Sequence, residues 1–267
     1  MSSTEGLRRE RPPVSLVALA LVGLAFLVVP LVGLLQRAAW SDLATLLTSG
    51  VATDALRLSL LCSAAAAALS LVLGLPLAWV LARVEFPGRS VVRAVVLLPM
   101  VLPPVVGGVA LLFALGRQGL VGQWLDRWFG VTLPFTTAGA VVAATFVALP
   151  FLVVTVEGAL RSLDERYEAA AASLGAGPLT RFRRVTLPLI GPSIGAGVAL
   201  AWARALGEFG ATITFAGNLQ GRTQTLPLAV FLELQGDPAS AVALSLLLLA
   251  VSLTVLVALR GRLLQSR

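Results

Sequence analysis

Long uninterrupted runs of apolar residues dominate this sequence and restrict the folds that it can adopt. Six of these runs reach the roughly 20 helical residues that are needed to cross the core of a bilayer. They cover residues 14–35, 55–81, 94–115, 138–160, 193–215 and 239–259. Inside a bilayer the backbone cannot bond to water, so runs of this length must form helices. The sequence therefore predicts an all-α integral membrane protein with six transmembrane helices.

The first run differs from a cleavable secretion signal. Its apolar part is about 22 residues long, whereas the apolar part of a signal peptide has about 7–15, and no small-residue cleavage site follows in "QRAAWSDL". We therefore expect an uncleaved anchor helix. The predicted organisation is a tail at 1–13, a first helix at 14–35, a transmembrane core at 55–259 with a polar loop at 161–189, and a tail at 260–267.

The distribution of arginine predicts the orientation of the chain. Fourteen arginines fall in the N-terminal tail, the second and fourth loops and the C-terminal tail, and five fall in the loops on the other side. Because basic residues accumulate on cytoplasmic loops, both termini are expected in the cytoplasm. The net charge of +7 is thereby explained by topology, and a nucleic-acid partner is not needed.

Several absences argue against a self-contained enzyme. All 20 basic residues are Arg, so a phosphate-binding loop that ends in Gly-Lys-Ser/Thr cannot be present. The chain has no His, which is the commonest general base and metal ligand. Its single cysteine, Cys62, cannot form a disulfide within the chain. We expect no catalytic residue, metal or cofactor in this chain.

Prolines interrupt the third apolar run, which contains "LPMVLPPVVGG" with Pro103 and Pro104. In a membrane, such interruptions persist where neighbouring helices or a water-filled cavity satisfy the freed carbonyl groups. One interpretation is simple bending of the helix. The other is that this span lines a pathway and bends as the pathway opens.

A polar segment, "EAAAASLGAGPLTRFRRVTLPL" at 168–189, separates the fourth and fifth runs. Just before it, Ser162 and Glu165 fit a capping box that starts a helix. Gly175 suits the left-handed conformation that ends a helix, and Pro178 suits the first position of a second helix. Pro188 is expected to stop that helix. The pattern predicts two short helices joined at a Gly-Ala-Gly corner.

Two interpretations of this segment remain open from the residues alone. Its first half has a face of small alanines at 169–172, which permits close approach to another surface, and its second half carries Arg181, Arg183 and Arg184. The arginines could hold a surface turn against anionic lipid headgroups. Alternatively, the segment could dock on another protein.

The same segment resembles the EAA loop of permease subunits of ATP-binding cassette importers. The family pattern is Glu-Ala-Ala, three residues, Gly, nine residues, an aliphatic residue, any residue, and Leu-Pro. The matching positions are Ala170, Ala171, Gly175, Val185, Leu187 and Pro188. The family's Glu falls at residue 169, which is Ala here, and Glu168 lies one position earlier. The resemblance implies the type I importer fold and a coupling helix seated on a separate ATPase subunit, which binds ATP and Mg.

Further stretches resemble the permease subunits of molybdate importers. They are "LPMVLPPVVGGVALL", "RALGEFGATITFAGN" and "GRTQTLPLAVF". The resemblance implies import of molybdate or tungstate by alternating access, in the cytoplasmic membrane of a bacterium or archaeon. The implied partners are a second copy, two ATPase subunits, an extracytoplasmic molybdate-binding protein and membrane lipid. Sulfate and thiosulfate permeases share a similar "RALGE" segment but tend to have Tyr in place of Phe209.

Two other classes of function stay open. A secondary anion transporter would work without an ATPase, and such proteins often contain repeated, similarly interrupted halves, for which this sequence gives no convincing sign. A membrane enzyme would need a catalytic set that the sequence does not offer.

Ionisable residues in the fifth run are candidates for the translocation pathway. Arg204 and Glu208 are four residues apart, so a helix would place them on one face. They could form an internal ion pair that fixes helix packing, or Arg204 could offer positive potential to a passing dianion while Glu208 limits its affinity. Thr212 could offer a hydroxyl to an oxyanion or bond its own backbone.

Glycines and a fourth-run carboxylate have simpler expected roles. Gly207 and Gly210 are expected to allow close helix packing. Glu157 is expected to reach the membrane interface at the cytoplasmic end of its span. The segments at 41–54, 116–137 and 216–238 are expected to receive the binding protein, and "TLPLAVFLEL" is expected to be a short interfacial helix, too short for a seventh span.

Overall fold

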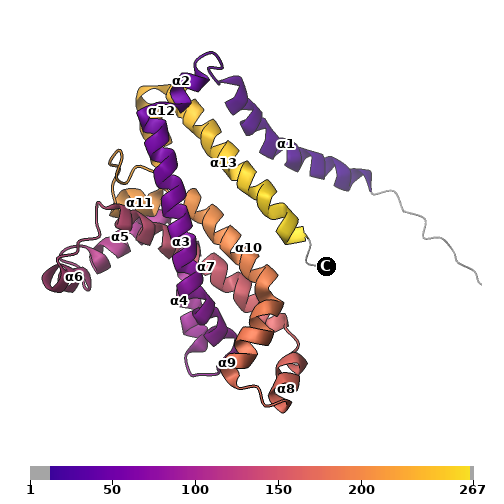
Figure 1. Cartoon of the computed structure of the whole chain (residues 1–267). Helices are drawn as coiled ribbons and strands as arrows, with labels where there is room; N and C mark the ends of the chain where they lie inside the picture. Colours follow the sequence, from indigo (N-terminus) through magenta and orange to yellow (C-terminus); the bar gives the residue numbers. More distant parts are fainter. Residues whose placement is uncertain (1–12, 265–267) are drawn as a thin grey trace, which may run out of the picture.

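The computed structural model describes residues 13–264, and every regular element among them is helical, as the sequence predicts (Figure 1). In chain order the elements are α1 (Val14–Gln36), α2 (Leu43–Leu47), α3 (Gly50–Arg83), α4 (Arg89–Val101), α5 (Pro104–Leu115), α6 (Gly122–Phe129), α7 (Thr137–Ser162), α8 (Glu165–Ser173), α9 (Pro178–Arg181), the π-helical turn η1 (Phe182–Thr186), α10 (Leu187–Leu206), α11 (Gly210–Phe215), α12 (Leu226–Gly236) and α13 (Pro238–Leu264).

Five helical stretches of the described chain are long and apolar enough to cross a membrane. They are α1, α3, α7, the run from Pro178 to Leu206, and α13. The pair α4 and α5 adds a sixth crossing if the two are one bent span. Of the predicted tails, residues 1–12 and 265–267 lie outside the described residues.

The centre of the structure is the contact among α3, α7 and α10 (Figure 1). Alanines contribute much of this contact, among them Ala66 and Ala78 on α3, Ala148 on α7 and Ala201 on α10, all with no exposed surface. In lipid, helices associate by close packing, and small side chains let their backbones approach. At Gly74 the approach is so close that an added Cβ would lie 2.8 Å from the Leu152 side chain.

The third predicted span is broken, because α4 and α5 meet at an angle of 119°. One continuous helix over 94–115 is therefore wrong, and the bend is a sharp break between two helices. Consecutive prolines cause the break, since the residue before a proline is pushed out of the helical region. Leu102 and Pro103 both have extended backbone, with ψ of 136° and 131°, and Pro104 then opens α5.

The fifth predicted span, 193–215, is also wrong as one helix. α10 ends at Leu206, the chain turns through Gly207 and Phe209, and α11 follows. At its other end α10 begins before the predicted start, at Leu187.

Pro188 does not stop the second helix of the polar segment, contrary to expectation. It lies in the first turn of α10, directly after the π-helical turn η1, in which the Leu187 N–H bonds to the Phe182 carbonyl oxygen five residues back. This change in the hydrogen-bond pattern lets the helix continue past a residue that has no N–H. η1 joins α9 to α10 without interruption, so the helical run extends from Pro178 to Leu206.

The two helix breaks lie against each other. An added Cβ at Gly210, the first residue of α11, would lie 2.9 Å from Pro104 Cβ, and one at Gly108 would lie 2.7 Å from Thr214 Cβ. The packing role expected for Gly210 is thus confirmed. Gly207 has only the Ala203 carbonyl oxygen near its added Cβ, at 3.8 Å, so it makes no comparable contact with another helix.

A second cluster forms at the opposite end of α3, where α12 packs against α3 and α13 (Figure 1). Leu226 and Ala229 are fully buried there with Ala52. The Leu226 N–H donates to Ser59 Oγ at 2.7 Å. The predicted short helix is confirmed, but it is partly buried in the chain where an interfacial position was expected.

Replacing Gly108 with Ala tests the contact between α5 and α11. The added methyl would overlap the Ala211 carbonyl, and overpacking of this kind costs about 1–3 kcal/mol. We expect the Tm of the detergent-purified protein to fall by several degrees. Gly158→Ala on α7 is the matched control, because nothing lies within 4 Å of its added Cβ. Equal Tm changes in the two variants would contradict the close contact.

Candidate functional site

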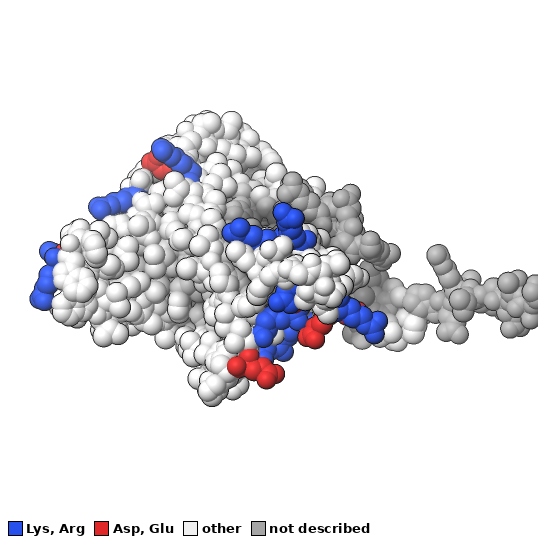
Figure 2. Space-filling model, turned by 60° about the horizontal axis from the view of Figure 1, so that its bottom comes forward, with Lys and Arg blue, Asp and Glu red and all other residues white. Residues whose placement is uncertain are grey.

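The polar segment forms the predicted pair of short helices, α8 and α9, at one end of the molecule (Figure 1). Figure 2 brings this end forward and shows arginines and carboxylates clustered there. The expected capping box is wrong. Asp164 caps α8 by accepting from the Arg166 N–H at 2.9 Å, while Ser162 ends α7 and bonds the Ala159 carbonyl oxygen.

The corner between the two helices depends on Gly175. Its φ is +82°, in the left-handed region that favours glycine, as predicted. The Ala176 N–H then reaches back to the Ala171 carbonyl oxygen at 3.0 Å, which closes the end of α8. Next to the corner, Leu174 is 88% exposed. This side chain is free to contact another surface, and both interpretations of the segment, protein docking and contact with lipid headgroups, stay predictions.

The remaining motif positions lie on three elements, and α9 separates the first of these from the second. Ala170 and Ala171 lie in the middle of α8, Val185 lies in η1, and Leu187 and Pro188 open α10. The described part of α8 contains no buried residue, so little apolar packing of its own holds it.

Glu168 points back toward the rest of the chain. Its Oε1 lies 3.3 Å from Arg83 Nη2, at the end of α3, and accepts a 2.8 Å hydrogen bond from Thr186 Oγ1. Glu165, one turn earlier, reaches the same Arg83 at 3.4 Å but is far more exposed.

A buried carboxylate, Glu157, lies between two arginines near this end. Its Oε1 is 2.6 Å from Arg93 Nη2 and 2.9 Å from Arg161 Nη2, and its side chain is 9% exposed. Glu157 is thus enclosed by these two arginines, and its place at the membrane interface stays a prediction. Arg89 adds a further link by donating to the Leu81 carbonyl oxygen at the end of α3.

Arg204 and Glu208 form the predicted ion pair, with 2.7 Å between Nη1 and Oε2. Glu208 lies in the break after α10, so the two are not on one continuous helix as expected. Its other oxygen accepts the Ala211 N–H at 2.7 Å, at the start of α11. The pair therefore connects the two helices across the break, with Glu208 2% exposed and the Arg204 side chain 25% exposed.

The other candidates for the translocation pathway lie at the starts of α5 and α11. Thr212 is buried within α11, and the neighbouring Thr214 hydroxyl donates to its own backbone at Gly210. Pro103 and Pro104 are exposed at the start of α5.

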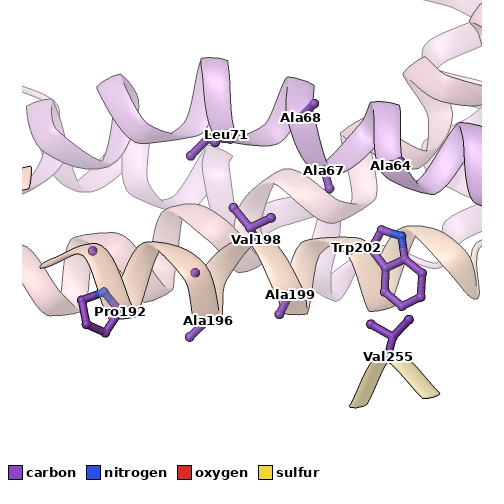
Figure 3. A pocket seen from close by; sticks show the side chains of 12 residues that line it. Ala64, Ala67, Ala68, Leu71, Pro192, Ala196, Val198, Ala199, Trp202 and Val255 are labelled. Carbon is purple, nitrogen blue, oxygen red and sulfur yellow. The ribbon is translucent and has the colours of Figure 1, made fainter. Parts of the chain in front are cut away.

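A cavity of about 790 Å³ opens between α3, α10 and α13, and none of the pathway candidates lines it (Figure 3). Its walls include Ala64 and Leu71 on α3, Ala196 and Trp202 on α10, and Val255 on α13. Sequence reasoning did not identify these residues. The available signal was the spacing of four between Gly191, Gly195 and Ala199, which places small residues on one face of α10.

Comparison with known protein families identifies the family to which this sequence belongs. The sequence model described as binding-protein-dependent transport system inner membrane component matches residues 70–266. The chain belongs to this family. The match includes the polar segment and both broken spans, and of the helices that line the cavity it includes α10, α13 and the last part of α3.

Similar curated proteins include several permeases. The molybdenum transport system permease protein ModB of Mycobacterium bovis is 49% identical over 91% of this chain and 92% of its own length. Its namesake in Escherichia coli K12 is 43% identical over 76% of this chain and 89% of its own. The sulfate transport system permease protein CysT of Escherichia coli K12 is 38% identical over 90% of this chain and 87% of its own.

Solved structures share the fold. A bacterial ABC transporter involved in the import of the acidic polysaccharide alginate superposes with a TM-score of 0.74, at 22% identity and 95% coverage of both chains. The same kind of transporter in complex with an alginate pentasaccharide-bound periplasmic protein gives a TM-score of 0.72, at 22% identity, over 92% of this chain and 91% of that one.

Replacing Glu157 with Gln tests the buried charge cluster. The substitution keeps the shape of the side chain but leaves two arginines without their carboxylate, and we expect a loss of about 1–3 kcal/mol. The matched control is Asp126→Asn, whose partner Arg117 is 75% exposed and whose pair should contribute about 0–1 kcal/mol. Denaturant unfolding of the purified protein measures both, and equal losses would contradict a special role for Glu157.

Proposed function

We propose that this chain is the permease subunit of an ATP-driven importer that carries molybdate or tungstate across the cytoplasmic membrane of a bacterium or archaeon. The observation that carries this proposal is 49% identity to a molybdenum permease over 91% of the chain. The similar sulfate permeases have lower identity, at 37–38%, so sulfate is the second candidate. Family membership supports a transport role in which a separate subunit hydrolyses ATP and binds Mg.

The proposed assembly contains two copies of this chain, two ATPase subunits and an extracytoplasmic binding protein. In it, both termini and the polar segment face the cytoplasm, as the arginine distribution predicts. The exposed Leu174 and the left-handed corner at Gly175 support docking of α8 on the ATPase. The segments at 41–54, 116–137 and 216–238 would receive the binding protein.

We propose that the translocation pathway runs past the two helix breaks, one between α4 and α5 and the other between α10 and α11. Half-helices whose ends meet inside a membrane are typical of substrate sites in transporters. Arg204 supplies positive charge there and Glu208 partly neutralises it, which suits weak, transient contact with a dianion. Pro103, Pro104 and Thr212 complete the proposed set, because the starts of α5 and α11 lie in contact.

Uptake by vesicles that hold the permease, its ATPase and its binding protein tests the function. We expect labelled molybdate to accumulate only when ATP is enclosed with the ATPase subunits, and labelled sulfate to accumulate far less. Equal or greater uptake of sulfate would make sulfate the substrate. Uptake of molybdate without the ATPase would indicate a secondary transporter.

Replacing Gly175 with Val tests the docking corner. A β-branched residue at φ +82° is strained, and about 1–2 kcal/mol of strain shifts an equilibrium roughly 5- to 30-fold. We expect ATP-dependent uptake to fall by about this factor while the protein still inserts and dimerises. Gly177→Val is the matched control, because its φ of −66° and ψ of 164° suit valine and nothing crowds it. Normal uptake by Gly175→Val would contradict the coupling role of the corner.

A further inference from the structure

Glu168 lies one residue before the position of the glutamate in the family pattern, and this offset changes the direction of its side chain. The family pattern has its glutamate at residue 169, but this chain has alanine there and glutamate one residue earlier. One residue turns a helical side chain by about 100°. Glu168 accordingly faces inward, with Arg83 and Thr186 both at its Oε1.

Both partners lie at the ends of central helices. Arg83 is the last residue of α3, and its side chain is 15% exposed. Thr186 is the last residue of η1, directly before α10, and is 1% exposed. One carboxylate oxygen thus connects α8 to two of the three helices of the central contact. Hydrogen bonds between charged groups and partly buried partners are among the stronger ones in proteins.

These links are the main attachment of α8 among the described residues. The side-chain hydrogen bonds that leave α8 go to Arg83 and Thr186, and no residue of α8 is buried. α9 and η1 are attached differently, by apolar contacts. The Phe182 ring lies edge-on to Trp79 of α3 at 6.3 Å, and Pro178 lines a small apolar pocket beside it.

We propose that Glu168 is a positioning residue that transmits movement of α8 to α3 and α10, and that it does not contact the ATPase. The inference rests on the proposed function, because it assigns a role within that coupling. It also explains how the chain can lack the family's glutamate at 169. The exposed surface of α8 that remains for docking contains the alanines at 169, 170 and 172 together with Glu165, Arg166 and Tyr167.

Glu165 offers a matched control on the same helix. It carries the same charge and approaches the same Arg83, but its side chain is 87% exposed and it has no second partner. Glu168→Ala removes both inward bonds, whereas Glu165→Ala removes one solvated contact. Any effect of net charge on the docking surface is common to both variants.

A distance measurement tests the link itself. Spin labels at Ala172 and Glu85, both exposed, in a Cys62→Ala background would report the separation of α8 from the end of α3 in the full complex. We expect a narrow distribution in the parent and in Glu165→Ala, and a distribution at least twice as broad in Glu168→Ala. An unchanged distribution in Glu168→Ala would overturn the proposal.

The ratio of substrate taken up to ATP hydrolysed tests transmission. We expect this ratio to fall at least fivefold in Glu168→Ala and less than twofold in Glu165→Ala, with the affinity for the ATPase subunit unchanged in both. A weakened affinity at an unchanged ratio would mean that Glu168 touches the ATPase, which overturns the proposal. If the parent complex takes up no substrate, the proposed function fails, and the distance measurement alone decides on the link.

Discussion

Close packing of α3, α7 and α10 through small side chains is the contact on which the rest of the structure depends. In lipid there is no hydrophobic driving force for helices to associate. Helices therefore pack together where small side chains let their backbones approach closely. Alanines and Gly74 make this possible along the centre of the molecule. The broken helices α5 and α11 then pack on α7, and α12 and α13 pack at the far end of α3.

Ion pairs hold helix ends together at the end of this centre that carries the polar segment. Glu157 joins α7 to α4 through Arg93, and Glu168 joins α8 to α3 through Arg83. Arginine suits both positions because its planar group can serve several acceptors at once and stays ionised when partly buried. The arginines that indicate orientation in the sequence therefore also fasten the elements that would couple to a partner.

Local patterns in the sequence predict much of this fold. Runs of apolar residues predict the helices, and Gly175 predicts the corner, because each depends on nearby residues alone. The break at Pro103 and the continuity at Pro188 are harder, since a proline can end a helix or begin one. Arg83, one of the two partners of Glu168, is 85 positions away and cannot be identified from spacing. The cavity beside Trp202 depends on how three helices meet, which no single segment reveals.

The unbroken run from Pro178 to Leu206 constrains how such a chain can change over evolution. Each residue of a helix turns the next by about 100° and advances it by about 1.5 Å. One residue inserted in this run before Arg204 would turn the Arg204–Glu208 ion pair as a unit by about 100° relative to the corner at Gly175. Loops such as the one around Gly130 absorb an insertion by bulging outward. We therefore expect relatives to differ in length in such loops and not in the helical run between the corner and the ion pair.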